Sequence, residues 1–285
     1  MSTSRPAMSK ISGKPVGTVG FGMLGLTKPW APVEYPAALK VLKTALEQGS
    51  NFWNGGIHYG TPTANSLHLI KHYFEQYPED VDKVCLSIKG AFDMKNGPDG
   101  SPEGISASVD YALEVLGGVK TIDVFELARV DPRVPVETSV QTLADLVKEG
   151  KVGGIGLSEV SAATIRKEHG VHTIAAVEIE LSLFTADPLH NGIVITCHDL
   201  GIPVIAYSPI SRGWLTGEQA ASIDRDFLAI YRSLPGNTLV QSHTAAEDVR
   251  RAVLTCFIGR SGNWLIVFDG VDELHKGDKN FVDLP

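Results

Sequence analysis

The chain has 285 residues, a formal net charge of −8 at pH 7, 43% hydrophobic residues and 20% charged residues. This composition is typical of a globular protein and excludes a collagen-like or wholly disordered chain. The acidic balance, without a block of Lys or Arg, argues against nucleic-acid and anionic-membrane partners. No stretch approaches the roughly 18 apolar residues that span a bilayer. Three widely spaced cysteines and the lack of an apolar leader favour a reducing, cytoplasmic setting.

Short apolar runs bounded by Gly, Pro or charged residues predict strands buried on both faces. In chain order they cover residues 19–23, 51–53, 84–89, 122–127, 154–158, 176–180 and 204–207. Helical spacing of apolar residues marks the segments between them, at 36–48, 65–77, 106–116, 136–149, 162–168 and 189–200. This alternation predicts right-handed βαβ units and favours a (β/α)₈ TIM barrel, with residues 11–17 as a hairpin that caps its floor.

The alternation ends near Gly217. Beyond it, residues 223–234 and 245–257 have helical patterns, and residues 264–268 form one apolar run. That run could fill the eighth position of the barrel, because seven strands leave two unpaired edges. The alternative is an open barrel with a loose helical tail. The predicted organisation is therefore a flexible N-terminus at 1–14, a barrel at 15–217 that is incomplete or atypically closed, and a divergent segment at 218–285.

Residues at the carboxyl ends of the predicted strands are the candidates for chemistry, because a barrel of this kind builds its site there. Lys89 ends the third strand, Tyr59 follows Asn54 by five residues, and a Ser/Gly-rich turn follows the seventh strand. A buried lysine is costly unless it is paired or functional. Position alone leaves Lys89 open to either interpretation, a salt-bridged residue or a catalytic one.

Five motifs in fixed order carry a resemblance to a known family. They are GFGM at 20–23, GSNFWNGG at 49–56 with Tyr59-Gly60, LSIK at 86–89, GIGLS at 154–158 and AYSPISRGWLTG at 206–217. Together they resemble the aldo-keto reductases, a family of (β/α)₈ barrels that reduce carbonyls with NADPH. The Asn-Gly-Gly variant and ARVDP at 128–132 most resemble the fungal pyridoxal reductase branch.

The resemblance implies a catalytic set of Tyr, Lys, Asp and His. Tyr59 matches the acid and Lys89 the lysine, whereas Asn54 stands at the Asp position and Ala128 at the His position. An ordinary tyrosine has a pKa near 10, and a nearby ammonium would lower that pKa and make the phenol a usable acid. His58 could substitute for the missing histidine, or it could be a surface residue.

The resemblance also implies NADPH as the cofactor, and no metal. Ser158 would hold the nicotinamide carboxamide, Tyr207 would stack on the ring, and Arg212 would contact a phosphate. Glu159 and Glu178 stand where the family usually has Asn and Gln. The full set of implied cofactor residues is Gly22, Met23, Ser158, Glu159, Glu178, Tyr207, Ser208, Pro209, Ile210, Ser211, Arg212, Gly213 and Leu215.

The C-terminal segment departs from the family, since the Arg and Asn residues that grip the adenosine 2′-phosphate have no counterpart. Residues 262–273 instead resemble a Walker B strand of NB-ARC-type NTPases, but the chain has no Walker A motif, so no nucleotide hydrolysis is expected.

Three functions follow as hypotheses. The first is an NADPH-dependent, monomeric reductase of a small aldehyde or ketone, with pyridoxal as the branch-based substrate. The second is a vestigial barrel with impaired catalysis and a binding role. The third is a signalling fragment whose acidic strand docks on a partner NTPase.

Overall fold

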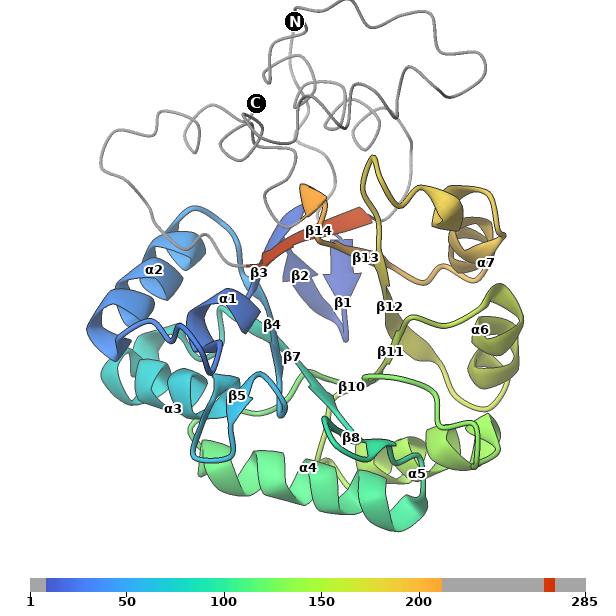
Figure 1. The fold of residues 1–285 in the computed structure, drawn as a ribbon, viewed down its shortest axis with the longest axis horizontal. Coiled ribbons are helices and arrows are strands. Elements are labelled where there is room, and N and C mark those ends of the chain that lie inside the picture. Colours follow the sequence, from blue (N-terminus) through green and yellow to red (C-terminus); the bar gives the residue numbers. More distant parts are fainter. Residues whose placement is uncertain (1–8, 212–263, 270–285) are drawn as a thin grey trace, which may run out of the picture.

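The computed structural model describes residues 9–211 and 264–269, which form a closed barrel of eight parallel strands inside a ring of helices (Figure 1). The barrel strands are β3 (Val19–Gly22), β4 (Phe52–Gly56), β7 (Cys85–Gly90), β10 (Val124–Leu127), β11 (Ile155–Ser158), β12 (Ile174–Glu180), β13 (Val204–Tyr207) and β14 (Trp264–Asp269). The predicted (β/α)₈ barrel class is confirmed.

The eighth strand closes the barrel from the far end of the chain. β14 pairs in parallel with β13, where Val204 lies opposite Trp264, and with β3, where Ile266 lies opposite Val19. Of the two alternatives for the C-terminal segment, the structure therefore has the one in which residues 264–268 fill the eighth position. The helices predicted at 223–234 and 245–257 lie outside the described residues.

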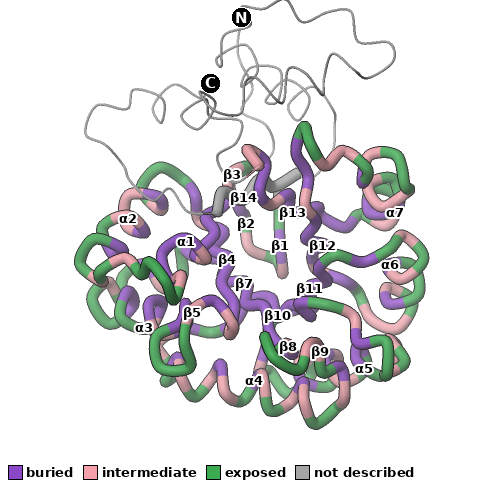
Figure 2. The backbone as a smooth tube through the Cα atoms, in the orientation of Figure 1, coloured by how far each residue is buried: buried purple, intermediate pink, exposed green. Residues whose placement is uncertain are grey.

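Helices cover the outside of the barrel and bury one face each against it (Figure 2). They are α1 (Leu24–Thr27), α2 (Tyr35–Glu47), α3 (Ser66–Gln76), α4 (Pro102–Leu116), α5 (Val136–Lys148), α6 (Ala162–His169) and α7 (Ile193–Asp199), with 3₁₀ turns at Pro78–Asp80 and Asp187–Leu189. Trp53 anchors the packing of α3, with its ring 4.8 Å from that of Tyr73 and 5.8 Å from that of Phe74. Over the described ranges, no helix is long and apolar enough to cross a membrane.

An antiparallel hairpin closes the floor of the barrel, at the amino ends of the strands. Its strands are β1 (Ser9–Ile11) and β2 (Lys14–Val16), which confirms the predicted floor cap. The hairpin begins inside the segment that was predicted to be flexible. Its apolar residues pack into one cluster with the first inward-facing residues of five barrel strands, namely Ile11, Val16, Phe52, Cys85, Val124, Ala176 and Ile205.

The barrel interior changes from apolar to polar toward the other end. Alternate residues of a barrel strand face inward, so each floor residue is followed two positions later by another interior residue. From the floor cluster these next residues are Asn54, Ser87, Glu126, Glu178 and Tyr207, and on β7 the residue after that is Lys89. The first four and Lys89 are buried. The strand sequences thus concentrate polar groups near the carboxyl ends.

Glu168, at the end of α6, is a buried acid outside the barrel. Both of its carboxyl oxygens lack a hydrogen-bond partner among the described residues. Burial, together with the charge of Glu137, raises the pKa of Glu168 to about 8. The folded state therefore holds this proton between about pH 4.5 and pH 8, where the unfolded chain has lost it, and stability falls as the pH rises through that window.

Replacing Glu168 with methionine is expected to raise the free energy of unfolding by about 2 kcal/mol at about pH 8, and by less near pH 5. The physical reason is that methionine fills a similar volume without an ionisable group. Denaturant unfolding at the two pH values measures the effect. The exposed Glu114→Met is the matched control. An equal gain at both pH values would contradict this account.

Candidate active site

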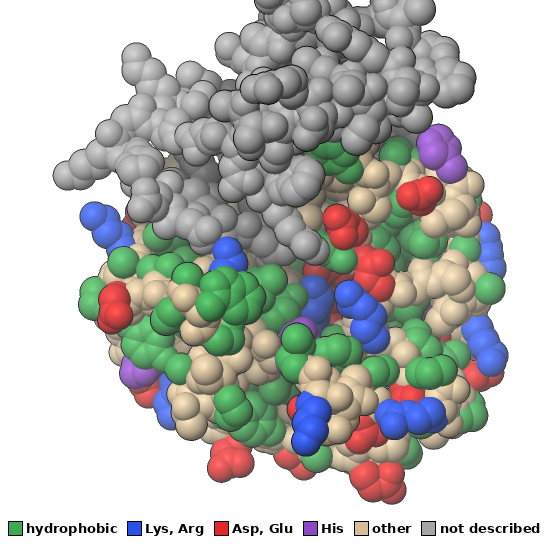
Figure 3. Space-filling view, in the orientation of Figure 1, with side chains coloured by type: hydrophobic (Ala, Val, Ile, Leu, Met, Phe, Trp, Pro, Cys, Tyr) green, Lys and Arg blue, Asp and Glu red, His purple; other side chains and the backbone are tan. Residues whose placement is uncertain are grey.

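The carboxyl ends of the eight parallel strands meet at one face of the barrel. On the face shown in Figure 3, acidic, basic and histidine side chains lie together near its centre. Two short hairpins follow strands at this end, β5 (Gly60–Thr61) with β6 (Ala64–Asn65) after β4, and β8 (Phe92–Asp93) with β9 (Gly97–Pro98) after β7. The candidate site residues lie at these strand ends and in the turns that follow them.

Backbone contacts fix Tyr59 just beyond β4. Its amide donates to the Gly56 carbonyl at 3.1 Å, and its carbonyl accepts from the Ser66 amide at 3.0 Å. The Ile57 amide donates to the Lys89 carbonyl at 2.9 Å, which ties this turn to β7. A Cβ atom on Gly56 would lie 3.0 Å from the Tyr59 ring, so glycine is what allows the ring to pack against the strand.

Tyr59 and Lys89 meet in the barrel mouth. The Lys89 ammonium donates a hydrogen bond to the Tyr59 hydroxyl over 3.1 Å. Their exposed fractions are only 8% and 5%, so the contact is largely shielded from water. The same ammonium lies 5.3 Å from the centre of the Tyr207 ring, which places Tyr207 beside the pair. The sequence-predicted acid and lysine are thus neighbours in one buried space.

Glu178 on β12 forms an ion pair with Lys89. Burial alone would lower the pKa of Lys89, but the negative charge of Glu178 beside it raises that pKa well above the ordinary lysine value. Lys89 is therefore a cation at neutral pH. The resemblance assigns Glu178 to the cofactor amide, and that role stays a prediction; in the structure its carboxylate contacts Lys89 and Asn54.

Asn54 lies between two buried acids. Its side-chain nitrogen donates to Glu178 over 2.7 Å and to Glu126 over 3.2 Å. Ser87 also donates to Glu126. Burial and the charge of Glu178 raise the pKa of Glu126 well above the ordinary value, so this carboxyl keeps its proton.

Ala128 leaves the histidine position of the family without a polar group, and two basic residues lie close by. His58 is half-buried, with its ring 4.8 Å from that of Tyr59. Burial, and then the charges of Lys89 and Arg129, lower the pKa of His58 to about 4, so its imidazole is neutral. Arg129 donates to the Ala128 carbonyl over 2.6 Å and reaches Ser158 at 3.5 Å.

Further cofactor candidates line the rim on β3, β11 and β13. Gly22 ends β3, and the Met23 amide donates to the Asn54 carbonyl at 2.9 Å. Ser158 ends β11 and is buried, and Glu159 follows it with a φ of 55°. The Glu159 carboxylate accepts from the Glu180 amide at 2.7 Å. These residues are at the mouth, as the sequence predicted.

The turn after β13 offers polar groups for a ligand. Ser208 and Ser211 have φ values of 50° and 52°, and the Ser211 amide donates to the Ser208 carbonyl at 2.8 Å. Left-handed non-glycine residues tend to cluster at ligand sites. The Ser211 hydroxyl is buried and has no partner in the part of the chain that the structure describes, which fits a site for a phosphate oxygen. Pro209 and Ile210 complete this turn, and Arg212, Gly213 and Leu215 lie outside the described residues.

Replacing Gly56 with alanine is expected to displace the Tyr59 ring and to lower kcat about tenfold, because a small misplacement of a reacting group has a large effect on rate. Cofactor affinity should change little, since Gly56 contacts the tyrosine. Steady-state kinetics and a binding titration measure both quantities. Gly170→Ala is the matched control, because this glycine is exposed at the end of α6 and has a φ of −69°, which alanine adopts readily. An unchanged kcat in Gly56→Ala would contradict the packing argument.

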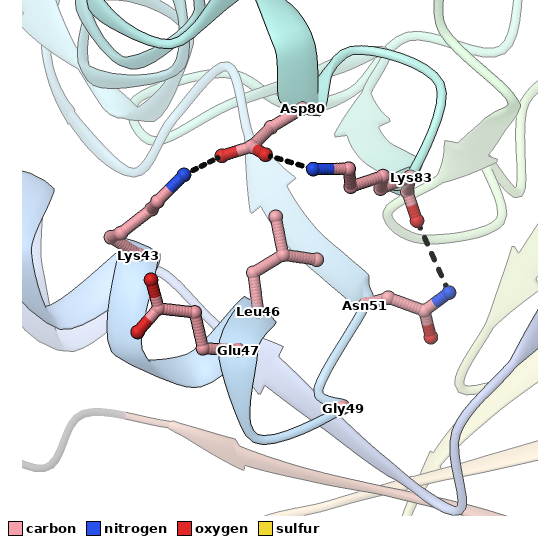
Figure 4. Close-up of a pocket in the computed structure, with 7 residues that line it drawn as sticks. All are labelled: Lys43, Leu46, Glu47, Gly49, Asn51, Asp80 and Lys83. Atoms are coloured by element: carbon pink, nitrogen blue, oxygen red, sulfur yellow. Dashed lines mark hydrogen bonds and ion pairs between the residues drawn. The ribbon is translucent and has the colours of Figure 1, made fainter.

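A cavity of about 390 Å³ lies at the other end of the barrel (Figure 4). Its lining residues are Lys43, Leu46, Glu47, Gly49, Asn51, Asp80 and Lys83, which belong to α2 or precede β4 and β7. Asp80 pairs with Lys43 at 2.7 Å and with Lys83 at 2.8 Å. Because these charges satisfy each other and lie at the floor, the cavity is separate from the chemistry at the mouth.

Glu126 and Ser87 are the site residues that sequence reasoning missed. Glu126 is the one charged residue in the strand Val-Phe-Glu-Leu, and it lies opposite Lys89 in the register of β7 and β10. An acid inside an apolar strand was a signal that the sequence offered. Ser87 precedes Lys89 by two positions, and the inward alternation of the strand would have placed it on the same face.

Comparisons with known proteins bear on this site. A family model described as "Aldo/keto reductase family" matches residues 18–246, which extends past the boundary predicted at Gly217. The protein named probable pyridoxal reductase 2 of Schizosaccharomyces pombe is 45% identical over 230 residues, covering 79% of this chain and 68% of that protein. An aldo-keto reductase of Strobilurus tenacellus is 36% identical over 234 residues, covering 79% and 68%. The resemblance of residues 262–273 to a Walker B strand gains no support.

A solved structure shares the fold. The glycerol dehydrogenase of Gluconobacter oxydans superposes with a TM-score of 0.71 at 20% identity, covering 93% of this chain and 86% of that one. At this identity the likeness shows the architecture alone. The chain spans 63–68% of the length of the curated relatives it matches.

Proposed function

Because this chain belongs to the aldo/keto reductase family, we propose that it reduces an aldehyde or ketone to the alcohol, with Tyr59 as proton donor and Lys89 as the cation beside it. The observation that carries the proposal is the 3.1 Å contact between the Lys89 ammonium and the Tyr59 hydroxyl in the barrel mouth. A buried residue with a strongly shifted pKa in such a position, as Lys89 is, is a candidate for a part in acid–base chemistry.

The chain's own residues supply the proton side of the reaction. Tyr59 donates its hydroxyl proton to the carbonyl oxygen of the substrate as that oxygen becomes an alkoxide. Lys89 stabilises the phenolate that Tyr59 leaves behind, and it can do so because its ammonium is held charged and out of water. Neutral His58, at the edge of the Tyr59 ring, is available to hydrogen-bond the same carbonyl in place of the residue missing at Ala128.

A nicotinamide dinucleotide, NADPH by resemblance, would supply the hydride when bound. Tyr207 would present its ring to the nicotinamide, and Ser158 would bond its carboxamide. Ser208 to Ser211 would lie against the pyrophosphate. Two observations support this role: the Ser211 hydroxyl has no partner among the described residues, and Arg212 is its neighbour in the sequence. Glu159 would accept from the carboxamide nitrogen.

The substrate we propose is pyridoxal or a small aldehyde of similar size. The name of the relative from Schizosaccharomyces pombe, at 45% identity, supports this choice. The domain organisation that we propose is a barrel of residues 15–217 completed by the strand Trp264–Asp269.

The test mixes the purified full chain with NADPH and pyridoxal and follows the loss of reduced nicotinamide by absorbance. Turnover that needs both reagents is expected, with NADPH binding at micromolar Kd by titration calorimetry. A folded chain that binds NADPH but reduces neither pyridoxal nor a panel of small aldehydes would leave the vestigial barrel as the function. If the folded chain neither binds NADPH nor reduces an aldehyde, the proposed cofactor site is rejected as well.

A further inference from the structure

The Lys89 ammonium is buried, and a buried charge is stable only beside an opposite one. The titratable groups that face it come from several elements: Tyr59 and His58 after β4, Glu126 on β10, Glu178 on β12 and Tyr207 on β13. Among the described residues, Glu178 is the carboxylate in direct contact with it. The positive charge beside the proton donor therefore depends on a residue of β12, three strands from β7 around the barrel.

Asn54 holds Glu178 in that position. An amide nitrogen carries two hydrogens and can donate to two acceptors. The nitrogen of Asn54 donates to Glu178 at 2.7 Å and to Glu126 at 3.2 Å, and the Asn54 side chain is buried. One oxygen of Glu178 thus faces the amide while the other faces Lys89. An aspartate at position 54 would instead repel the Glu178 carboxylate.

Glu126 adds a second carboxyl without adding a second charge. It accepts from Ser87 and Asn54, and within the described part of the chain none of its hydrogen bonds or ion pairs is with a cation. Two ionised glutamates beside one ammonium would leave a net negative charge inside the barrel, which is costly. A proton on Glu126 makes the cluster of Lys89, Glu178 and Glu126 neutral as a whole.

Resting on the reductase function above, we propose that Glu178 is a positioning residue: its carboxylate, oriented by the Asn54 amide and accompanied by a protonated Glu126, holds the Lys89 ammonium charged against the Tyr59 hydroxyl. The role assigned to Glu178 is exerted through Lys89. Its role predicts effects on proton donation and on its pH dependence, and little effect on cofactor binding.

The first test is Glu178→Gln, with the exposed Glu114→Gln as matched control. We expect kcat to fall about 10- to 100-fold and the alkaline limb of the pH profile to move down by at least about one pH unit, because desolvation then favours neutral Lys89. The Kd for NADPH should stay within about threefold of wild type. A kcat loss with an unmoved pH profile, or a Kd weakened more than about tenfold, would overturn the proposal in favour of a structural or cofactor role.

The second test relocates the charge with Asn54→Asp in the Glu178→Gln background. The glutamine introduced at position 178 would then donate to the aspartate introduced at position 54, which reverses the hydrogen bond and keeps the negative charge in the same cluster. We expect at least about tenfold recovery of kcat over Glu178→Gln and a return of the alkaline limb toward higher pH. A double variant no more active than the single one contradicts the proposal.

The third test does not depend on activity. Lys89→Met and Glu178→Gln should each lower the unfolding midpoint by about 5–10 °C, because each leaves a buried polar partner unpaired. The two changes combined should recover most of that loss. Additive losses would refute the ion pair itself. If the cycle shows the coupling but the wild-type chain reduces no aldehyde, the proposed reduction fails while the buried pair stands.

Discussion

Replacing Tyr59 with phenylalanine is expected to lower kcat/KM for aldehyde reduction by about 10³-fold, the range that a positioned proton donor contributes. The change removes the hydroxyl that accepts from Lys89 and leaves the ring, which packs against Gly56. NADPH affinity and the unfolding midpoint should therefore stay near the wild-type values. Steady-state kinetics with pyridoxal, together with calorimetry and thermal unfolding, measure the three quantities.

Tyr77→Phe is the matched control, because Tyr77 is a half-buried tyrosine near the floor whose hydroxyl accepts from the exposed side chain of Gln76. Its activity should equal that of wild type. If Tyr59→Phe retains more than about a tenth of the wild-type kcat/KM, a proton donor other than Tyr59 is at work, and the neutral imidazole of His58 is the first candidate.

Replacing Lys89 with methionine is expected to lower kcat by about 10²–10³-fold, because the phenolate of Tyr59 then forms without a cation beside it. This variant differs from Tyr59→Phe in stability. Methionine leaves the Glu178 carboxylate buried without its partner, which destabilises a fold by about 3–5 kcal/mol. Kinetics and denaturant unfolding separate the two effects.

The pH dependence of the wild-type stability follows from the same ion pair. Because the pKa of Lys89 is raised in the folded state, the stabilising contribution of this ion pair is present below the ordinary lysine pKa and is lost only as the pH rises through the folded value.

The matched control for Lys89→Met is Lys40→Met, at an exposed position on α2, which should change neither activity nor stability. A Lys89→Met variant as active as this control would remove the cation from the mechanism.

The sequence predicted the fold best where a single strand carried its own apolar pattern. The runs that became β3, β7, β11 and β13 are short and mostly apolar, so the positions of these strands and their parallel order could be predicted directly. Strand position made Tyr59 and Lys89 candidates, and the family resemblance predicted that they would be neighbours. Helix limits were less predictable. Gly192, with a φ of 90°, separates Asp187–Leu189 from α7, and α4, capped by Ser101, begins four residues ahead of the expected start.

The polar interior could not be read in the same way. Asn54, Glu126 and Glu178 belong to three strands separated by 72 and 52 residues, and closure of the barrel is what brings them together. The family resemblance gave Glu178 a cofactor role, which stays a prediction, and it did not predict the contact between Glu178 and Lys89, because a resemblance aligns positions without showing which side chains meet. Arg212, Gly213 and Leu215 lie outside the described residues, so their cofactor role stays a prediction.

The most direct test of the central claim follows the hydride itself. The purified full chain is incubated with pyridoxal and NADPH that carries deuterium at both C4 positions, and the alcohol is analysed by mass spectrometry. The account predicts a product with one deuterium on the new carbinol carbon, formed at a rate that falls about 10³-fold in Tyr59→Phe. An alcohol without deuterium, or labelled product formed equally fast by Tyr59→Phe, would contradict it.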